Sequence, residues 1–598
     1  MKFGVLALDY DGTIAIDGSL DPDVRAAIAE VRSAGVVVVL VTGRILDDLR
    51  GVAGDLRFVD AVVAENGAVL AYPATGHSMV LGPSPPPRFV EQLKKRRIEI
   101  TCGACVIEAQ ASDAHAILTL VREMELPLVL LFNRARLMIL PETVSKAVGL
   151  REALAGLRLS AHNAIAIGDA ENDHRLLEVC EIGVAVGWGS DALKAVADEV
   201  LEGAGPSAVA DYIRHVGASP SLSPRRVGRR RLLLGHEVGG GPVELGVRGG
   251  NVLVAGDPRS GKSWAAGLIC EQLIFYRYCI CVVDPEGDYT GLELLPGVVI
   301  LGGDDPPPRA RELIRALRHP DMSVVIDLSR LGHVEKLEYM QSLLPTLTML
   351  RRRTGLPHRI VVDEAHYFLS GPDVHELLDL ELGGYTLITY QASNLHPDVQ
   401  AANETTIVTL ATDPREVRAL ARMSGCPERH EEWSAVLGQL DLAEAAVLPT
   451  GDDAVGRLLR FRLVPRLSSH VRHREKYLDV PVPQGRAFVF SLDGEATGPR
   501  ASTLKELLDV LATTPVGAMD GHLRRSDFSR WIGDVFGDHF LASQVWKLEE
   551  QYRVGWAVDV NDRIVDVIEE RYELPDALSV HWVSKTEDDA SDPPEGSQ

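Results

Sequence analysis

Two acidic residues near the start of the chain could act on a phosphate group. Asp9 and Asp11 lie two residues apart, directly after the apolar run 5–8. At the end of a strand, one carboxylate can attack phosphorus while the second transfers the leaving-group proton. We therefore expect Asp9 to be a nucleophile and Asp11 a general acid and base.

Three later segments supply the other groups that this chemistry needs. Thr42 ends a β-branched run and can donate to a phosphoryl oxygen, and Lys146 can add a fixed positive charge. Asp169 and Asp173 follow another apolar run, and with the two earlier carboxylates they are suited to bind Mg²⁺ through oxygen. Each segment alone is more often structural. Their order along one stretch predicts a Mg²⁺-dependent phosphohydrolase.

The four segments LALDYDGT, VVVVLVTGR, VSKAVGL and AIAIGDAENDH resemble the motifs of the haloacid dehalogenase superfamily, and GDAENDH resembles its Cof-type sugar-phosphate and phosphoglycolate phosphatases. The resemblance covers residues 1–216. It implies a hydrolase domain with an α/β cap over residues 75–140 and a phosphorylated small molecule as substrate. It assigns the phosphatase site to Asp9, Asp11, Thr42, Lys146, Asp169 and Asp173.

A cysteine pair lies inside the expected cap. Cys102 and Cys105 are written CGAC, but a zinc site needs about four ligands and no second pair follows at matching spacing. We favour a structural role over zinc binding or redox chemistry.

A second set of residues has the pattern of a phosphate-binding loop. Residues 256–263 read GDPRSGKS, which fits G-x-x-x-x-G-K-[ST] between an apolar strand and a helical pattern. Backbone N–H groups of such a loop surround the phosphates, Lys262 reaches the β and γ oxygens, and Ser263 supplies a hydroxyl to Mg²⁺. We expect ATP to bind to Gly256, Asp257, Pro258, Arg259, Ser260, Gly261, Lys262 and Ser263.

An acidic pair completes this second pattern. Asp363 and Glu364 end the apolar run in RIVVDEAH. Asp363 is expected to hold Mg²⁺ and Glu364 to activate the attacking water. Because a buried carboxylate is costly without a cation nearby, this function is favoured over a structural one.

These segments, with CVVDPEGDYTG and ITYQASN, resemble the HerA/FtsK group of P-loop ATPases over residues 235–465. The resemblance implies a RecA-like fold, an acidic turn at residues 284–288 and a polar sensor at Gln391. It also implies a homo-oligomer, because this group often forms hexameric rings that move DNA with an arginine supplied in trans. The arginine stays open between residues 351–353 and the set Arg415, Arg418 and Arg422, with solvated helix faces as the alternative.

Both sites need strands that bring their loops to one edge of a sheet. Up to residue 216, short β-branched runs alternate with helical patterns, which predicts an α/β fold with a parallel sheet. Five further runs between residues 251 and 389 predict a second parallel sheet. One helix is expected between Asp21 and Gly35, with Pro22 in its first turn and an apolar face of Val24, Ala27, Ile28 and Val31.

The remaining segments are less regular. Residues 217–234 are rich in Ser, Pro and Arg and predict an exposed linker. Its arginines and the basic run 470–476 are candidates for contact with phosphate backbones, with solvent exposure as the alternative. Residues 485–575 predict a small, mostly helical domain, and the acidic residues 585–598 predict a disordered tail.

The composition limits the partners and the compartment. A net charge of −24 over 598 residues argues against a surface that binds polyanions everywhere, so any DNA contact must be local. Seven cysteines fit a reducing compartment. No run approaches the roughly 18 apolar residues of a membrane span, and acidic residues interrupt the N-terminal apolar stretch. We expect a cytoplasmic protein without a membrane anchor.

These patterns predict a bifunctional enzyme that uses Mg²⁺ to hydrolyse a phosphomonoester and ATP. The alternative is a HerA-like, ATP-driven DNA translocase in which the first domain is an accessory or a metabolite sensor. A third hypothesis is a regulatory module in which a phosphorylated metabolite gates the ATPase.

Overall fold

The computed structural model describes residues 2–133, 136–218, 230–237, 240–247, 250–449, 457–468, 482, 486–491, 499–536, 539–555 and 559–572. The chain divides into two compact units, Met1–His470 and Val471–Gln598. The helices in the described ranges are all too short or too polar to span a membrane. The expected tail, the basic run 470–476 and most of the expected linker lie outside the described residues.

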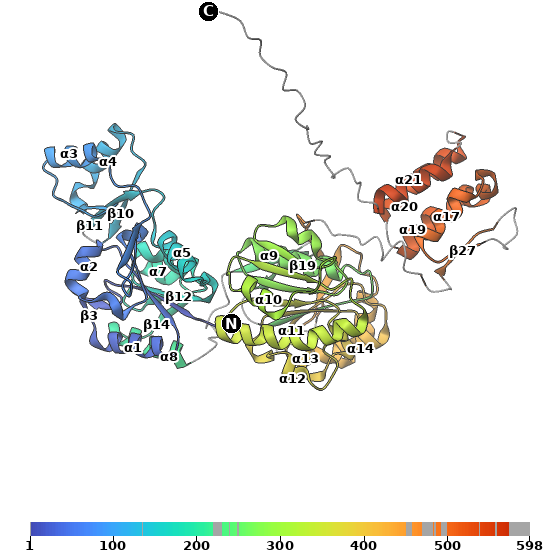
Figure 1. The fold of residues 1–598 in the computed structure, drawn as a ribbon, viewed down its shortest axis with the longest axis horizontal. Coiled ribbons are helices and arrows are strands. Elements are labelled where there is room, and N and C mark those ends of the chain that lie inside the picture. Colours follow the sequence, from blue (N-terminus) through green and yellow to red (C-terminus); the bar gives the residue numbers. More distant parts are fainter. Residues whose placement is uncertain are drawn as a thin grey trace, which may run out of the picture. The chain divides into compact units, whose positions relative to one another are not determined.

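An eight-stranded sheet forms the first part of the larger unit (Figure 1, blue to cyan). The strand order is β14-β13-β12-β1-β4-β5-β6-β7, and the strands from β14 to β5 in this order are parallel. The antiparallel β6 and β7 close one edge. The strands are β1 (Val5–Asp9), β4 (Val37–Val41), β5 (Ala61–Ala64), β6 (Val69–Tyr72), β7 (His77–Val80), β12 (Ala164–Gly168), β13 (Ile182–Val186) and β14 (Glu199–Leu201).

Helices cover both faces of this sheet because successive strand residues point to opposite sides. Leu6 and Leu8 of β1 join the buried cluster that includes α1 and α8, whereas Val5 and Ala7 join the cluster with α5, α6 and α7. Helix α1 has the predicted cap and the predicted buried face. The helices are α1 (Pro22–Ser33), α2 (Leu46–Ala53), α5 (Lys146–Leu157), α6 (His174–Val179), α7 (Asp191–Val196) and α8 (Pro206–Ala218).

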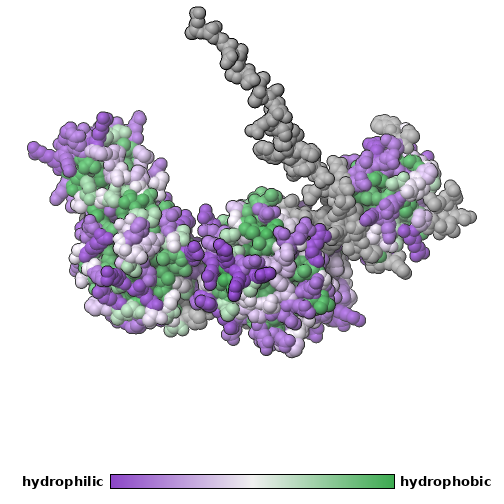
Figure 2. All heavy atoms as spheres, in the orientation of Figure 1, coloured by the Kyte–Doolittle hydropathy of each residue, from purple (hydrophilic) through white to green (hydrophobic). Residues whose placement is uncertain are grey.

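A smaller α/β layer is inserted between β7 and α5. Its antiparallel sheet has the order β10-β11-β9-β8, and α3 and α4 pack on it through Phe89, Leu93, Ile117 and Leu120. The surface over these two helices is mainly hydrophilic (Figure 2). The elements are α3 (Pro87–Lys95), β8 (Ile100–Cys102), β9 (Ile107–Gln110), α4 (Ala114–Glu123), β10 (Leu128–Asn133) and β11 (Arg136–Pro141). Strand β7, which lies in the expected cap range, belongs to the large sheet instead.

An eleven-stranded mixed sheet forms the second part of the unit (Figure 1, green to orange). Its order is β16-β15-β25-β24-β23-β17-β22-β21-β18-β20-β19. The five runs expected as parallel strands are β17, β18, β20, β21 and β22, and they are parallel. Strands β24, β25, β15 and β16 extend one edge in antiparallel pairing, so the sheet is not parallel throughout.

The strands of this sheet have the following bounds: β15 (Arg231–Glu237), β16 (Pro242–Gly246), β17 (Asn251–Ala255), β18 (Ile280–Asp284), β19 (Val298–Gly302), β20 (Ser323–Asp327), β21 (Arg359–Val362), β22 (Tyr385–Thr389), β23 (Asn403–Val408), β24 (Glu444–Val447) and β25 (Leu459–Leu463). Strand β15 begins inside the range expected for the linker. Its Leu232 and Leu234 are buried, which explains why residues 231–234 pair as a strand.

Helices also cover both faces of the mixed sheet. Helix α9 packs on one face, and α10, α11, α14 and α15 pack on the other. The helices are α9 (Lys262–Phe275), α10 (Ala310–Leu317), α11 (His333–Thr354), α12 (Val374–Leu377), α13 (Pro397–Ala401), α14 (Pro414–Met423) and α15 (His430–Leu437).

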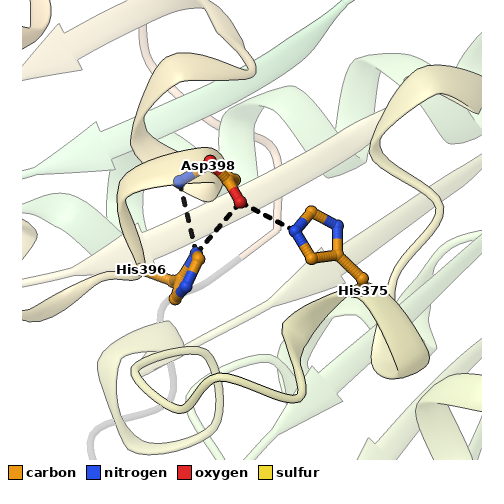
Figure 3. Close-up of side chains that lie close together, drawn as sticks. All are labelled: His375, His396 and Asp398. Atoms are coloured by element: carbon orange, nitrogen blue, oxygen red, sulfur yellow. Dashed lines mark hydrogen bonds and ion pairs between the residues drawn. The ribbon is translucent and has the colours of Figure 1, made fainter.

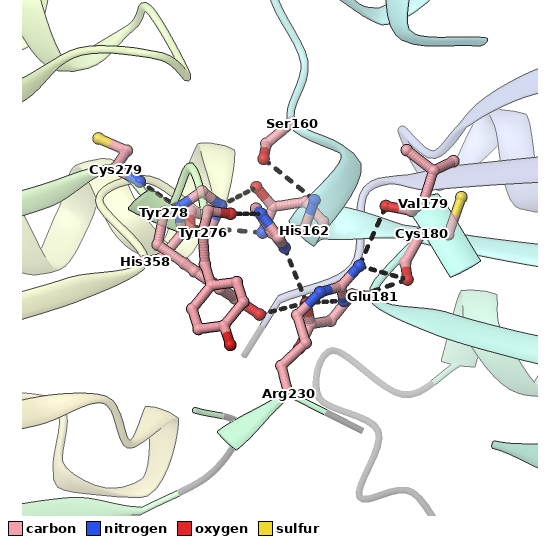
Figure 4. A network of polar contacts seen from close by, with 12 residues as sticks. Ser160, His162, Val179, Cys180, Glu181, Arg230, Tyr276, Tyr278, Cys279 and His358 are labelled. Atoms are coloured by element: carbon pink, nitrogen blue, oxygen red, sulfur yellow. Dashed lines mark hydrogen bonds and ion pairs between the residues drawn. The ribbon is translucent and has the colours of Figure 1, made fainter. Parts of the chain in front are cut away.

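A buried carboxylate, Glu181, joins the two sheets of this unit (Figure 4). Its Oε2 accepts from Tyr278 Oη at 2.8 Å and Arg230 Nη1 at 3.0 Å, and lies 2.9 Å from His162 Nδ1. The His162 ring stacks on Tyr278 with 3.7 Å between ring centroids. Arg230, expected in the exposed linker, is therefore a partner of a buried ion pair.

A second buried histidine extends this network. His358 Nδ1 accepts from the backbone N–H of Cys279 at 2.9 Å, and its Nε2 lies 3.2 Å from Asn163 Oδ1. A ring that accepts at Nδ1 donates from Nε2, so this geometry fits a neutral imidazole. Asn163 in turn donates to the carbonyl of Lys2 at 2.8 Å.

Residues 471–598 form a separate, mostly helical unit in the part that the structure describes. Its helices are α17 (Leu504–Thr513), α18 (Asp520–Arg525), α19 (Asp527–Phe536), α20 (His539–Arg553) and α21 (Val560–Tyr572), and a short pair joins β26 (Phe488–Val489) to β27 (Arg500–Ala501). Leu507, Phe528, Ile532, Val545 and Ile564 are among its core residues.

Candidate active sites

Three of the predicted phosphatase residues come together at the end of adjacent strands. Asp9 ends β1, Thr42 follows β4 and Asp169 follows β12. Because β12, β1 and β4 are parallel neighbours, these three residues lie at the same edge of the sheet. The predicted strand ends therefore bring the predicted side chains to one place.

Lys146 bridges two carboxylates of this group. Its Nζ lies 2.5 Å from Asp9 Oδ1 and 2.6 Å from Asp173 Oδ1, and all three side chains are buried. Burial and the charge of Asp173 raise the pKa of Asp9 well above its ordinary value. Burial alone would lower the pKa of Lys146, but Asp173 and Asp9 together hold it above its ordinary value.

The same carboxylates have the geometry of a cation site. Oxygens of Asp9, Asp169 and Asp173 all lie within 4.8 Å of one another. Asp173 is oriented by the backbone N–H groups of Asp169 and Ala170, which donate to its Oδ2 at 3.1 and 3.2 Å. A set of carboxylate oxygens is the donor set that Mg²⁺ prefers, so these residues fit the predicted ion.

Asp11 has a different partner, which the sequence reasoning missed. Arg44 donates from Nε and Nη2 to the two oxygens of Asp11 at 2.7 Å each, and from Nη1 to Asp48 at 2.7 Å. In the described residues, the group of close carboxylates does not include Asp11. Arg44 lies two residues after Thr42 in a segment already singled out, and this adjacency was an available signal.

A cavity of about 580 Å³ opens over these residues. The strand ends line it with Asp9, Asp11, Thr42, Arg44 and Asp169, and the cap lines it with Glu108, Arg136 and Met138. Its volume is within the range of small-molecule sites. Arg136 Nη1 lies 3.1 Å from Glu108, so the cap presents a paired cation to the cavity. Neither cap residue was singled out from the sequence.

The CGAC segment is a turn that ties the cap to the core. The backbone N–H groups of Ala104, Cys105 and Val106 donate to the buried Glu65 carboxylate at 2.9 to 3.2 Å. The Cys105 thiol donates to the carbonyl of Gly82. In the described part of the chain, the two cysteines are free thiols and join no group of metal-ligating side chains. This turn accounts for the segment without zinc or redox chemistry.

The predicted phosphate loop lies between β17 and α9, which begins at Lys262. Gly256, Arg259 and Gly261 have positive φ angles. A Cβ on Gly256 would lie 2.1 Å from Thr409 Oγ1, so this position requires glycine. Lys262 Nζ donates to the carbonyl of Asp257 at 2.8 Å across the loop.

Acidic residues converge beside this loop. Ser263 Oγ donates to Asp288 Oδ2 at 3.0 Å, and Asp284 accepts from the backbone N–H of Gly287, Asp288 and Tyr289. Burial, followed by the charges of Glu364 and Asp288, raises the pKa of Asp363 to about 8, while Lys262 lowers it. Glu364 has a left-handed backbone with φ of 46°. This concentration of negative charge favours a bound cation.

Gln391 lies two residues after the end of β22, which is paired between β17 and β21. The side-chain oxygen of Gln391 accepts from Asn394 at 2.7 Å, and the backbone N–H of Gln391 donates to Thr389 Oγ1. Thr389 Oγ1 also lies 3.0 Å from Nδ1 of His366. Burial and the charge of Lys262 lower the pKa of His366 to about 4, so this ring is neutral at pH 7.

The segment after β25 packs on α9. Glu271 accepts from the backbone N–H groups of Leu467 and Ser468 and from Ser468 Oγ, at 2.7 to 3.1 Å. The guanidinium of Arg466 lies 5.3 Å from the centroid of the Trp264 ring. This contact attaches residues 466–468 to the helix that begins at the phosphate loop.

The arginines considered for action in trans have different surroundings. Arg351 is buried and donates to the carbonyls of His358 and Gly383. Arg352 pairs with Asp379, and Arg418 donates to the carbonyl of Pro414. Arg351 therefore has a structural role within its own domain.

Comparison with known proteins matches the first third of the chain. The family model of haloacid dehalogenase-like hydrolases matches residues 6–112 and 104–213. A phosphoglycolate phosphatase of Methanosarcina mazei is 27% identical over 223 residues, which cover 34% of this chain and 91% of that protein. A phosphoglycolate phosphatase of Archaeoglobus fulgidus is 27% identical over 218 residues, covering 36% and 96%. The solved structure of a haloacid dehalogenase-like hydrolase from Bacteroides thetaiotaomicron is 18% identical, covers 36% of this chain and all of its own, and has a TM-score of 0.33.

Proposed function

We propose that this chain, in which residues 6–213 form a haloacid dehalogenase-like hydrolase domain, is an enzyme with two sites. The first site hydrolyses a small phosphomonoester, and the second hydrolyses ATP. The observation that carries the first activity is the contact of Lys146 with both Asp9 and Asp173 beneath the cavity. The second activity is supported by the phosphate loop beside the acidic residues Asp288 and Asp363.

At the first site, a carboxylate oxygen of Asp9 attacks phosphorus and the bond from phosphorus to the ester oxygen breaks. Asp11 gives a proton to the leaving alcohol. Water then attacks the aspartyl phosphate, Asp11 takes the proton from this water, and inorganic phosphate leaves. Thr42 donates to a phosphoryl oxygen and Lys146 holds Asp9 in place. Asp9, Asp169 and Asp173, with Asp11 as a further candidate, would hold Mg²⁺, and the bound ion would offset the negative charge of the phosphate.

A guanidinium that the cap contributes to the cavity supports a small anionic substrate. The two named relatives are phosphoglycolate phosphatases. We extend this substrate class to the present chain because Arg136 of the cap lines the cavity, and a guanidinium can bind a carboxylate with two hydrogen bonds. Release of phosphate from 2-phosphoglycolate and from a neutral sugar phosphate, measured side by side, tests this preference.

The first activity is tested with Asp9→Asn, which keeps the size of the side chain and removes the nucleophile. We expect phosphate release from every phosphomonoester to be lost. ATP hydrolysis should stay within about twofold of the wild type, because the second site has its own residues. Undiminished phosphate release by the variant would remove the nucleophile assignment.

At the second site, a water oxygen attacks the γ phosphorus, the bond to the oxygen between the β and γ phosphates breaks, and ADP leaves. Glu364 accepts the proton of this water. The loop N–H groups and Lys262 neutralise the phosphate charge, and Gln391 is the proposed polar sensor. Ser263 and Asp363 would hold Mg²⁺, and the bound ion would neutralise charge on the leaving phosphate.

The second activity is tested with Lys262→Ala. Removing one preorganised cation from the phosphates is expected to lower ATP turnover by about 100-fold or more. Phosphomonoester hydrolysis supplies the internal control and should not change. ATP turnover equal to that of the wild type would contradict the proposal. The same assay with and without duplex DNA, combined with the particle mass in solution, tests the DNA translocase and the oligomer that the HerA/FtsK resemblance implies.

A further inference from the structure

His375, His396 and Asp398 form a cluster that belongs to neither proposed site (Figure 3). His375 lies on α12, which follows the segment with Asp363 and Glu364. His396 caps the N-terminus of α13, and Asp398 lies in its first turn, shortly after Gln391. The sequence signal was weak because more than 20 residues separate the first histidine from the other two residues.

The three side chains point toward one another. His375 Nε2 lies 2.7 Å from Asp398 Oδ2, and His396 Nδ1 lies 3.6 Å from the same oxygen. Figure 3 shows both rings directed at this carboxylate. The three ligand atoms that the residues offer all lie within 4.8 Å of one another. Two imidazole nitrogens and one carboxylate oxygen are thus already gathered around one small volume.

The ring of His396 caps the start of α13, and an ion bound to its Nδ1 would replace this capping hydrogen bond. His396 Nδ1 accepts from the backbone N–H of Asp398 at 3.3 Å, so this nitrogen carries no proton in that arrangement. The N–H of His396 donates to the carbonyl of Leu369 at 2.9 Å, which fixes the start of α13 against the segment before α12. Pro397 restricts the backbone between the two ligands further.

We propose that His375, His396 and Asp398 bind a divalent transition-metal ion of the zinc class, with water completing the coordination. Two neutral imidazoles and one carboxylate form a common zinc donor set, whereas Mg²⁺ and Ca²⁺ prefer oxygen alone. Binding through Nε2 of His375 requires the neutral ring to carry its proton on Nδ1, so the ion replaces the contact of Nε2 with Asp398. A plain surface hydrogen bond between histidine and aspartate is the competing explanation, and it predicts no metal affinity.

Such an ion adds a link between two segments that already share a buried apolar cluster, through Leu369 and Leu395 among others, and a backbone hydrogen bond. Residues 365–377 follow the proposed water-activating pair, and residues 392–401 follow the proposed sensor. An ion that binds the folded arrangement and not the unfolded one stabilises the folded arrangement in proportion to its concentration. A bound ion would therefore stabilise the packing of these two segments against each other, whether or not the second site hydrolyses ATP.

The test is zinc binding by the full-length chain after removal of metals with a chelator. Excess Mg²⁺ is kept present to compete at the sites made of carboxylates, and zinc affinity is measured against a chromogenic chelator. We expect His375→Ala to weaken the tightest zinc site at least tenfold, since loss of a mere supporting partner already costs about that much. Asp398→Asn should act in the same direction. His319→Ala, which removes an exposed histidine elsewhere in the same domain, is the matched control.

Two further measurements separate this site from the phosphatase-like carboxylates and from a folding defect. Asp169→Asn weakens metal binding at the first site only, so it should leave the tight zinc site intact. Zinc should slow amide hydrogen exchange in residues 369–377 and 395–401 of the wild type but not of His375→Ala. Equal zinc affinity in His375→Ala and the wild type, or loss of the tight site in Asp169→Asn alone, overturns the proposal.

Discussion

Arg44 fixes the position of Asp11 with two hydrogen bonds to its carboxylate, one to each oxygen. A paired guanidinium is a planar and directional partner, so it orients the carboxylate as well as attracting it. Asp11 lines the cavity, where a general acid must reach the leaving oxygen. At the scale of single residues, the proposed proton transfer therefore depends on a side chain that does not itself transfer the proton.

We predict that Arg44→Ala lowers kcat for phosphomonoester hydrolysis by about tenfold or more, which is part of the 100-fold or larger gain that a placed acid and base provide. Arg44→Lys keeps the positive charge but lacks the planar pair of donors that binds both oxygens of Asp11, so it should recover only part of the rate. Steady-state phosphate release measures both variants. Arg50→Ala, in the helix α2 that follows Arg44, is the control: Arg50 is exposed and paired with Asp47, and the variant should match the wild type.

The positions of site residues near strand ends were predictable from the sequence, and the positions that depend on tertiary contacts were not. Asp9 and Thr42 follow apolar strands, so the sequence itself indicates where they lie. Arg136 faces the cavity only because the cap folds over the core, and no spacing within the cap indicates that. His375 and His396 come together only because the segment that carries α12 packs against the start of α13.

At the scale of elements, the turn 103–106 works as an anchor for the cap. It lies between β8 and β9, and its backbone N–H groups end on Glu65 of the core. A Cβ on Gly103 would lie 2.5 Å from the carboxyl carbon of Glu65, so the turn fits closely around this side chain. The cap is thus attached through the Glu65 carboxylate as well as through the two chain segments that connect it to the core.

We predict that Glu65→Gln loosens this anchor, because an amide offers one acceptor oxygen where the carboxylate offers two. Hydrogen bonds to a charged group are worth about 1.5–3 kcal/mol each, so the local cost is of the order of 2 kcal/mol. Amide hydrogen exchange at residues 103–106 should become faster and KM for the phosphomonoester should rise. Glu91→Gln, which affects an exposed pair on α3, should change neither quantity.

Five parallel strands of the mixed sheet, β17, β18, β20, β21 and β22, were predictable as elements, whereas its parallel strands β19 and β23 and its antiparallel edge were not. Strands β17, β18, β21 and β22 are buried on both faces and appear as continuous apolar runs. Strand β25 has the sequence LRFRL, with two arginines and one fully buried residue. Its partner β15 lies more than 200 residues earlier, as in the pair Gly235 and Leu463, so local pattern does not reveal the pairing.

At the scale of the larger unit, His358 makes the junction of the two sheets sensitive to pH. Burial, followed by the charge of His162, lowers the pKa of His358 well below its ordinary value of 6.5, and the charged groups Glu181 and Arg351 also act on it. The folded chain therefore disfavours the protonated form of His358, whereas the unfolded chain binds the proton near pH 6.5. The contribution of His358 to the free energy of unfolding is complete above about pH 6.5 and decreases as the pH falls below that value.

We predict that lowering the pH from about 8 to about 5.5 weakens the protection of amide hydrogens in residues 160–163 and 356–360. The rate of exchange in the wild type, divided by the rate in a variant with a neutral side chain at position 358, should therefore rise. His358→Gln retains a donor and an acceptor but cannot take a proton, so its protection should depend less on pH. Comparing both proteins at each pH removes the intrinsic pH dependence of exchange. Identical ratios at both pH values would show that His358 does not control the junction.

The contact of Glu271 with residues 467 and 468 also has a mechanical consequence. The chain leaves the mixed sheet after β25 and is fastened at once to α9, while Arg466 Nη1 lies 3.5 Å from the carbonyl of Ser263 in the first turn of that helix. A force that pulls on the polypeptide after residue 468 would therefore act on α9 before it acts on any strand. Helix α9, which starts at the predicted phosphate loop, would be the first part of the sheet domain on which such a force acts.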